Sequence, residues 1–309
     1  MSSPAPDNSA SGPIDIGLVR RLFHSPGNFA DSDFLRREIA GRMHERLALV
    51  KIAPRRVLDI GCADGPDLGR LHEQYPQAEV LGLDASETLL RCARERHQAA
   101  SSAVSRLFGR WLRQSGGGGP AGLVCGDLGH LPLQTGAVDL VWSNLVLHWH
   151  PQPDQVFSEW RRVLATDGLL MFSCFGPDSF REIRHAFAQA DHASHALSFV
   201  DMHDFGDMLV NAGFSTPVMD METITVTYES VDKLMADVRA WGGNPLLTRR
   251  RGLLGRAAWR RVADALEAMR GGDGRIPLTF EVVYGHAFRP APRQTASGEA
   301  IIRFEPRRK

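Results

Sequence analysis

Five short apolar runs alternate with amphipathic stretches between Arg55 and Phe175, and this alternation limits the possible folds more than any other feature. The apolar runs have the length of buried strands, and the stretches between them have helical periodicity. Strands that alternate with helices form a parallel sheet covered on both faces. We therefore expect an α/β, doubly wound fold. The five strands are predicted at RRVLDIG from Arg55, EVLGLD from Glu79, GLVCGD from Gly122, VDLVWSN from Val138 and GLLMFSCF from Gly168.

The remaining sequence extends this core at both ends. Two further strands, PVMDMETITVTY and LTFEVVYGHAF, and helices around them predict that the same sheet continues with an inserted helical cap. Between the second and third strands, residues 98–120 predict a helix and a flexible insertion at Gly116–Gly119. The predicted divisions are a disordered tail (1–14), an N-terminal helical lead-in (15–50), a ligand-binding core (51–176), the end of the sheet with its cap (177–290) and a second tail (291–309).

Charge and cysteine usage exclude several classes of protein. The 36 Lys and Arg equal the 36 Asp and Glu, which argues against attachment to nucleic acid or anionic membrane by net charge. The four cysteines form no C-x-x-C pair, so we expect neither a disulfide scaffold nor a cysteine zinc site, and a reducing cytoplasm fits best. No apolar run is long enough to span a bilayer, and the first thirteen residues lack the apolar core of a signal peptide.

The segment from Val57 to Gly65, VLDIGCADG, is the sharpest motif. An acidic residue, Asp59, closes a strand, and small residues then form a tight turn into a helix. Glycine in such a turn permits positive φ and close approach of a ligand to the backbone. A dinucleotide fingerprint that starts at Gly61 would need glycines where Ala63 and Pro66 stand, so the motif argues against NAD.

The same segment resembles motif I of the class I S-adenosylmethionine (SAM) methyltransferases, D/E-x-G-x-G-x-G, with Ala63 in place of the middle glycine. This resemblance implies a Rossmann-like, mostly parallel seven-stranded sheet and SAM as the co-substrate. It further implies that Asp84 binds the ribose hydroxyls, that Asp127 and Leu128 lie at the adenine, and that Asn144 lies at the methionine end. The residues implied to bind SAM are Asp59, Gly61, Ala63, Asp64, Gly65, Asp84, Ala85, Asp127, Leu128 and Asn144.

Longer segments, above all LPLQTGAVDLVWSNLVLHW and the run from Phe199 to Tyr228, resemble the biotin-synthesis methyltransferases, which are malonyl-acyl-carrier-protein (malonyl-ACP) O-methyltransferases. The resemblance implies that the free carboxylate of a malonyl thioester attacks the methyl group of SAM. A carboxylate is ionised at pH 7, so no general base is needed. Phe29 stands where this family often has a tyrosine. The SAM-fold assembly factors of respiratory complex I are similar too, so a protein-modifying enzyme or a non-catalytic assembly factor is the alternative.

A carboxylate substrate calls for an arginine or histidine to hold it. Four candidates follow the fourth and fifth predicted strands: His148, Trp149, Arg181 and Arg184. The sequence does not choose among them, because each also suits a packed loop or a solvated helix face. The histidine pairs His192–His195 and His148–His150 lack companion ligands, so we expect no metal.

An acyl carrier protein would be the partner, and carrier proteins of this kind are acidic. A basic stretch is therefore the predicted docking patch, since its side chains could pair with carboxylates and with the phosphopantetheine phosphate. A solvated surface is the alternative. Few aromatic residues lie within the stretch, which argues against nucleic acid. The patch comprises Arg249, Arg250, Arg251, Arg256 and Arg260, with Arg261 beside them.

Overall fold

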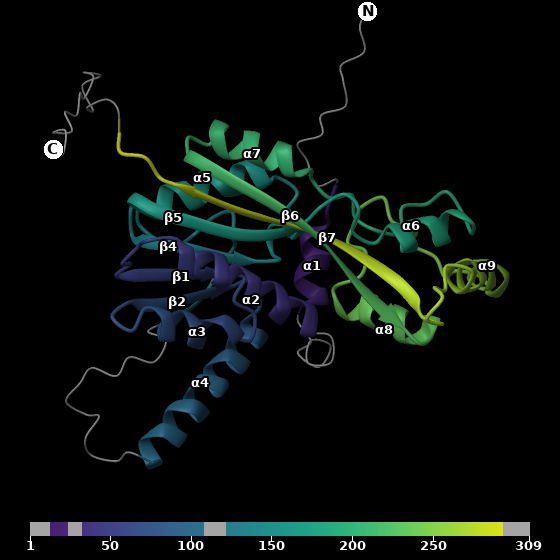
Figure 1. Cartoon of the computed structure of the whole chain (residues 1–309), viewed down its shortest axis with the longest axis horizontal. Helices are drawn as coiled ribbons and strands as arrows, with labels where there is room; N and C mark the ends of the chain where they lie inside the picture. The colour runs from purple at the N-terminus through teal and green to yellow at the C-terminus, as the bar shows by residue number, and fades with distance from the viewer. Residues whose placement is uncertain (1–12, 24–32, 108–121, 293–309) are drawn as a thin grey trace, which may run out of the picture.

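The structure, a computed structural model, describes residues 13–23, 33–107 and 122–292. Its centre is a twisted sheet with helices on both faces (Figure 1). The strands are β1 (Arg56–Ile60), β2 (Glu79–Asp84), β3 (Gly122–Cys125), β4 (Val138–Asn144), β5 (Leu164–Phe175), β6 (Ser215–Tyr228) and β7 (Ile276–Phe288). They lie in the order β3-β2-β1-β4-β5-β7-β6. The first five are parallel, whereas β7 runs antiparallel to both β5 and β6. The predicted doubly wound, mostly parallel, seven-stranded sheet is confirmed.

Alternating apolar side chains on the central strands pack against a different helix layer on each face. In β5, Leu169 and Met171 join one core cluster, and Leu170 and Phe172 join the other. This period-2 alternation is what a strand buried on both faces requires. The first face carries α2 (Phe34–Leu49), α3 (Pro66–Gln74) and α4 (Glu87–Leu107), and the second carries α5 (Pro153–Val163) and α7 (Met202–Asn211).

The chain order reverses at β1, which pairs with β2 on one side and β4 on the other. The connections after these strands diverge to opposite sides there, and open α/β sheets bind ligands in the crevice that results. A short 3₁₀ helix, η2 (Leu147–Trp149), follows β4 at this edge.

Three helices, α6 (Arg181–Ala188), α8 (Val231–Ala240) and α9 (Arg256–Glu267), gather at one end of β6 and β7 (Figure 1). Buried side chains such as Leu234 and Leu266 join the core cluster that contains Ile276. The helices arise from two insertions, because α6 precedes β6 and the other two lie between β6 and β7.

The predicted starts of the lead-in and of the insertion differ from the structure. The lead-in contains a first helix, α1 (Ile16–Leu22), and Ile14, predicted to lie in the tail, is buried and pairs with Leu246. α4 continues without a break through Leu107, although the sequence predicted a separate helix from residue 98. Gly116–Gly119, Phe29 and the tail after residue 292 lie outside the described residues. Within the described ranges, no helix is both long and apolar enough to cross a membrane.

Candidate active site

The turn after β1 adopts a backbone conformation that favours glycine. Gly61 has φ +75°, and a Cβ atom there would lie 2.2 Å from Cγ2 of Val146. Ala63, at the middle position of the motif, also has positive φ, +49°. Its N–H donates to Asp84 Oδ2 over 2.9 Å, while the N–H of Ser86 donates to Asp84 Oδ1 over 2.8 Å. The turn and the end of β2 are thereby held together around one carboxylate, and burial raises the pKa of Asp84.

A cleft at the carboxyl ends of the strands opens over this turn. We call it the strand-end cleft; it encloses about 720 Å³, counting the part open to solvent. Six of the ten residues predicted to bind a cofactor line it: Gly61, Ala63, Asp84, Ala85, Leu128 and Asn144. These residues come from separate strand ends that the parallel sheet brings to one edge.

The other four predicted residues lie around the cleft and do not line it. Asp59 is buried, its Oδ2 has no hydrogen-bond partner, and burial raises its pKa well above the usual range. Asp64 pairs with Arg36 (3.0 Å) and with Arg96. The carbonyl of Gly65 bonds to the ring of His97.

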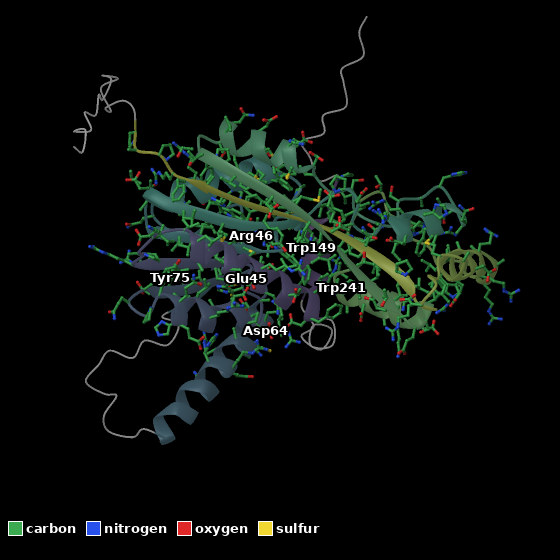
Figure 2. All side chains as sticks on the ribbon, in the orientation of Figure 1. Glu45, Arg46, Asp64, Tyr75, Trp149 and Trp241 are labelled. Atoms are coloured by element: carbon green, nitrogen blue, oxygen red, sulfur yellow. The ribbon has the colours of Figure 1, made fainter. Side chains whose placement is uncertain are left out.

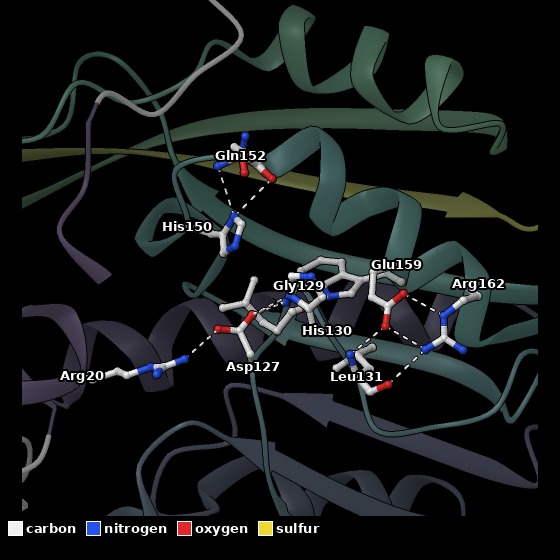
Figure 3. Close-up of polar contacts among 11 residues, drawn as sticks. Arg20, Asp127, Gly129, His130, Leu131, His150, Gln152, Glu159 and Arg162 are labelled. Atoms are coloured by element: carbon white, nitrogen blue, oxygen red, sulfur yellow. Dashed lines mark hydrogen bonds and ion pairs between the residues drawn. The ribbon is translucent and has the colours of Figure 1, made fainter. Parts of the chain in front are cut away.

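The fourth, Asp127, faces α1. Its carboxylate pairs with Arg20 over 3.1 Å and accepts the N–H of Gly129 over 2.8 Å (Figure 3). Further along the same loop, the N–H of Leu131 donates to the carboxylate of Glu159 in α5 over 2.6 Å. The loop after β3 is therefore fixed from two sides, with Leu128 left in the cleft wall.

Residues of the lead-in close the cleft, and sequence reasoning missed them. Val19, Arg20 and Phe23 of the α1 segment line it, and the Phe23 ring packs edge-on to Trp149 with centroids 5.0 Å apart. The Asp15 N–H donates a hydrogen bond to the carbonyl of Pro245 over 2.9 Å and holds the start of α1. The predicted helical lead-in (15–50) contains these residues, but no local pattern could show what its first helix covers.

Arg36 of α2 is a further cleft residue that the sequence analysis did not identify. Its guanidinium pairs with both Asp33 (2.7 Å) and Asp64 (3.0 Å), and it lines the cleft. Burial is the largest single effect on the Arg36 pKa and lowers it, but the two carboxylates together outweigh burial, and the pKa is raised. Asn144 donates to the carbonyl of Arg36 over 3.1 Å and accepts from Ser173 Oγ over 2.8 Å. This network ties β4 and β5 to the lead-in.

A second space, the apolar cavity, lies under the C-terminal helices and encloses about 700 Å³. Its walls are mainly aromatic and aliphatic, with a few polar side chains that include His148, His195 and Arg239. A smaller space of about 470 Å³, the linking cavity, shares Phe23, Arg36, Leu145 and Trp149 with the strand-end cleft and His148, Trp149, Phe175 and Trp241 with the apolar cavity. Trp149 lines all three spaces; Figure 2 shows it with Trp241 close to α1.

The four substrate-positioning candidates separate into two pairs. His148 and Trp149 line the cavities just described. Arg181 and Arg184 line none of the three; Arg181 pairs with Glu182 over 3.2 Å, and Arg184 donates to the carbonyls of Ser179 and Pro177. The arginines of α6 therefore stabilise the turn at the N-terminus of this helix.

The basic stretch also divides into two groups. Arg249, Arg250 and Arg261 are engaged: Arg249 pairs with Asp15 over 3.7 Å, Arg250 pairs with Asp191 over 2.7 Å, and Arg261 donates to the carbonyls of Gln189 and Ala190. Arg250 and Arg261 are nevertheless exposed. Arg251, Arg256 and Arg260 are exposed and make no ion pair or side-chain hydrogen bond within the described residues. Asp191 also bonds to His195, a wall residue of the apolar cavity, so the stretch lies beside that cavity.

No group of three or more His, Cys, Asp or Glu that could hold a metal occurs in the described part of the chain. The expectation of a metal-free protein stays a prediction.

The chain is similar to known methyltransferases in sequence and fold. Residues 58–172 match the family model described as a methyltransferase domain. The crystal structure of a candidate methyltransferase from Bacillus halodurans C-125 superposes with a TM-score of 0.55 at 16% identity, covering 82% of this chain and 100% of that chain. Together with the glycine turn and the strand-end cleft, these similarities define the protein as a class I methyltransferase, the class whose co-substrate is SAM.

Closer relatives narrow the class to a family. The malonyl-[acyl-carrier protein] O-methyltransferase of Laribacter hongkongensis is 48% identical over 297 residues, which cover 94% of this chain and 96% of that protein. The enzyme of the same name from Gallionella capsiferriformans is 44% identical over 292 residues, with 94% and 96% covered. The chain belongs to the malonyl-[acyl-carrier protein] O-methyltransferase family.

Proposed function

We propose that the protein transfers a methyl group from SAM to the free carboxylate of malonyl-ACP and forms a methyl ester, an early step in the synthesis of the biotin precursor. The relatives that carry this name are similar along almost the whole chain, cap included. This similarity favours the carboxyl methyltransferase over the complex I alternative, which no reported relative supports.

The strand-end cleft suits SAM, which supplies an electrophilic methyl group on a cationic sulfonium when bound. The left-handed turn at Gly61 keeps the backbone clear of side-chain atoms, and the Asp84 carboxylate is fixed by two N–H groups yet keeps lone pairs for a ribose diol. We assign SAM contacts to the six predicted residues that line the cleft. Asp59, Asp64, Gly65 and Asp127 would then support the turn, α2 and α1.

One observation carries the substrate side of the proposal. Trp149 lines the strand-end cleft, the linking cavity and the apolar cavity, so the two larger spaces meet at one residue. A thioester arm lying in the apolar cavity would bring a terminal malonyl carboxylate into the linking cavity, next to the cleft. Ligand cavities with apolar walls and few polar groups fit such an arm.

The chemistry asks little of the protein beyond placement. The attacking carboxylate is already ionised, so the chain must orient it in line with the methyl group and remove water from it. Phe23, Leu145 and Trp149 supply apolar walls where the spaces meet. Burial lowers the pKa of His148 to about 3, so its imidazole stays neutral at physiological pH and adds no charge there.

For the carrier protein we propose docking on the exposed part of the basic stretch, Arg251, Arg256 and Arg260, beside the apolar cavity. Positive side chains at the rim would steer an acidic partner toward the cavity. We also propose a cytoplasmic location, which the four free cysteines support.

Intact-mass spectrometry of malonyl-ACP after incubation with the protein and SAM tests the reaction. We expect a gain of one methylene that mild ester hydrolysis removes. Acetyl-ACP, which lacks the free carboxylate, is the matched control and should not change. If malonyl-ACP does not gain mass while calorimetry shows SAM binding, the proposed reaction is wrong, and a protein substrate or a non-catalytic scaffold is the interpretation that replaces it.

A further inference from the structure

His148 is a buried polar side chain that the proposed reaction has not yet used. It lies in η2, with Trp149, Phe175 and Phe199 at ring-centroid distances of 4.8, 5.0 and 5.6 Å. The side chain is 3% exposed and lines both the linking cavity and the apolar cavity. Its Nδ1 lies 3.7 Å from Cys174 Sγ, and among the described residues Nε2 has no hydrogen-bond partner. Nε2 is therefore available to whatever enters the cavities.

The neighbouring thiol determines which ring nitrogen carries the proton. Burial raises the pKa of the Cys174 thiol, so the sulfur keeps its hydrogen at physiological pH. Backbone N–H groups of Phe175 and His148 also donate to this sulfur, so its acceptor positions are in use and the thiol hydrogen is the group left to bond to Nδ1. A neutral imidazole that accepts a hydrogen bond at Nδ1 carries its proton on Nε2.

The linking cavity offers a carboxylate no uncompensated cation in the part of the chain that the structure describes. Among the described residues that line this cavity, Arg36 is the one Lys or Arg, and its charge is paired with Asp33 and Asp64. Arg239 lines the apolar cavity but not this one. A neutral N–H holds a carboxylate more weakly than a cation does, and so leaves more electron density on the attacking oxygen.

We infer that His148 binds the substrate carboxylate through Nε2–H, and that Cys174 is a positioning residue that fixes this tautomer. The inference rests on the proposed function for the identity of the carboxylate. One oxygen accepts from Nε2–H while the other attacks. An oxygen–carbon bond forms to the methyl group as the carbon–sulfur bond breaks, and that electron pair stays on sulfur, which becomes a neutral thioether. No proton moves.

Nitrogen-15 NMR of the full-length protein with labelled histidine tests the Cys174 step without substrate. The His148 signals are assigned by their loss in His148→Gln. We expect a single tautomer with the proton on Nε2 in the wild type and in Cys174→Ser, which keeps a donor, and a mixture of tautomers in Cys174→Ala. A wild-type His148 that carries its proton on Nδ1 overturns the inference, whatever the substrate is.

Steady-state kinetics with malonyl-ACP test the His148 step. His148→Phe keeps an aromatic ring but loses the donor, and we expect kcat/KM for malonyl-ACP to fall about 10- to 100-fold with the Kd for SAM unchanged. His148→Gln keeps an N–H donor and should recover most of the loss, while Cys174→Ala should lower kcat/KM about 3- to 10-fold, with recovery in Cys174→Ser. His203→Phe, at an exposed position of α7, is the matched control.

Two negative results have different meanings. If the wild type methylates malonyl-ACP and His148→Phe stays within about twofold of it, His148 does not hold the carboxylate. If the wild type leaves malonyl-ACP unchanged, the proposed function fails, and the assignment of His148 to the malonyl carboxylate fails with it.

Discussion

Asp59 shows how a single residue can be unfavourable for the fold and still be retained at a site. Its carboxyl is fully buried below the glycine turn, and Oδ2 has no partner. Burial, the neighbouring Asp67 and Asp84 raise its pKa, while Arg36 lowers it. A buried acid of this kind destabilises the folded chain at neutral pH, because ionising it there costs free energy.

Asp59→Asn should therefore stabilise the ligand-free protein by about 1 to 3 kcal/mol at neutral pH. Because the folded pKa is raised, the stabilising contribution of Asp59 is full below its unfolded pKa near 4 and is lost as pH rises through the folded value. The advantage of the variant should grow over that pH range and then level off. Urea denaturation between about pH 4 and 8 measures it. Asp207→Asn, at an exposed position, should show no such trend, and equal curves for both variants contradict the prediction.

Asp84→Ala should weaken SAM binding by about 1 to 3 kcal/mol, because it removes the carboxylate that faces the strand-end cleft. Since the pKa of Asp84 is raised, the SAM affinity of the wild type should begin to fall at a higher pH than it would with an aspartate of ordinary pKa. Isothermal titration calorimetry at several pH values measures the SAM affinity of the variant and the pH dependence of the wild-type affinity. An unchanged SAM affinity in the variant removes Asp84 from the proposed site.

Sequence reasoning at this scale found residues whose role follows from a strand end and failed for those whose role comes from distant contacts. Asp84 and Asn144 end β2 and β4, so the fold alone brings them to the cleft. Asp127 also follows a strand, yet Arg20 draws its carboxylate toward α1. Arg36 lies 28 positions before Asp64 in the chain, and no local pattern connects them.

α1 is a short helix that lines the strand-end cleft and is held there by contacts with distant parts of the chain. Two of its seven residues, Val19 and Arg20, line the strand-end cleft, as does Phe23 directly after it. The start of the helix is held by Ile14, which packs with Leu197 and Leu246. An isolated helix of this length is unstable in water. Its position over the cleft therefore depends on these contacts with the C-terminal part of the chain.

Leu246→Ala should loosen α1 and weaken SAM affinity about 3- to 10-fold, because only the docked fraction completes the cleft. Hydrogen exchange of residues 16–22 should quicken in the same variant. Leu253→Ala removes a leucine that is 95% exposed and is the matched control. A variant with faster exchange but wild-type SAM affinity would separate α1 from SAM binding.

The strands were predicted closely, whereas the lead-in and the insertion were less so, for a physical reason. β2 and β4 have the predicted bounds because apolar runs ended by polar residues define a buried strand locally. The predicted tail boundary missed Ile14, since its burial depends on Leu246, which lies far away in the sequence. The helix predicted within residues 98–120 is not a separate element, because α4 begins at Glu87 and continues to Leu107.

For the whole molecule, exposed arginines form separate groups although the net charge is zero. Exposed arginines of α9 lie at one end of the structure and those of α4 at another (Figure 1). The α9 group lies near the apolar cavity, because Arg261 bonds to the carbonyls of Gln189 and Ala190. The next residue, Asp191, joins Arg250 to His195 in the cavity wall. A neutral sequence can therefore still present a basic docking surface.

Reversing Arg256 and Arg260 to Glu should raise the KM for malonyl-ACP about tenfold and leave SAM affinity unchanged. Wild-type KM for the carrier protein should also rise with ionic strength, since exposed charges are screened. Reversal of Arg91 and Arg94, two exposed arginines on α4, changes the net charge equally and should leave KM unaltered. Equal effects of the two double variants would mean that net charge, and not this surface, attracts the carrier.

Trp149 forms part of the wall of every space in which a reactant is proposed to lie. A ligand that fixes the orientation of this indole prepares one wall of the neighbouring space for the other ligand, and the two affinities are linked through that effect. Reciprocity requires that whatever factor one ligand gains from the presence of the other is returned in full. The order in which the carrier and the methyl donor arrive can then change the path to the ternary complex but not its stability.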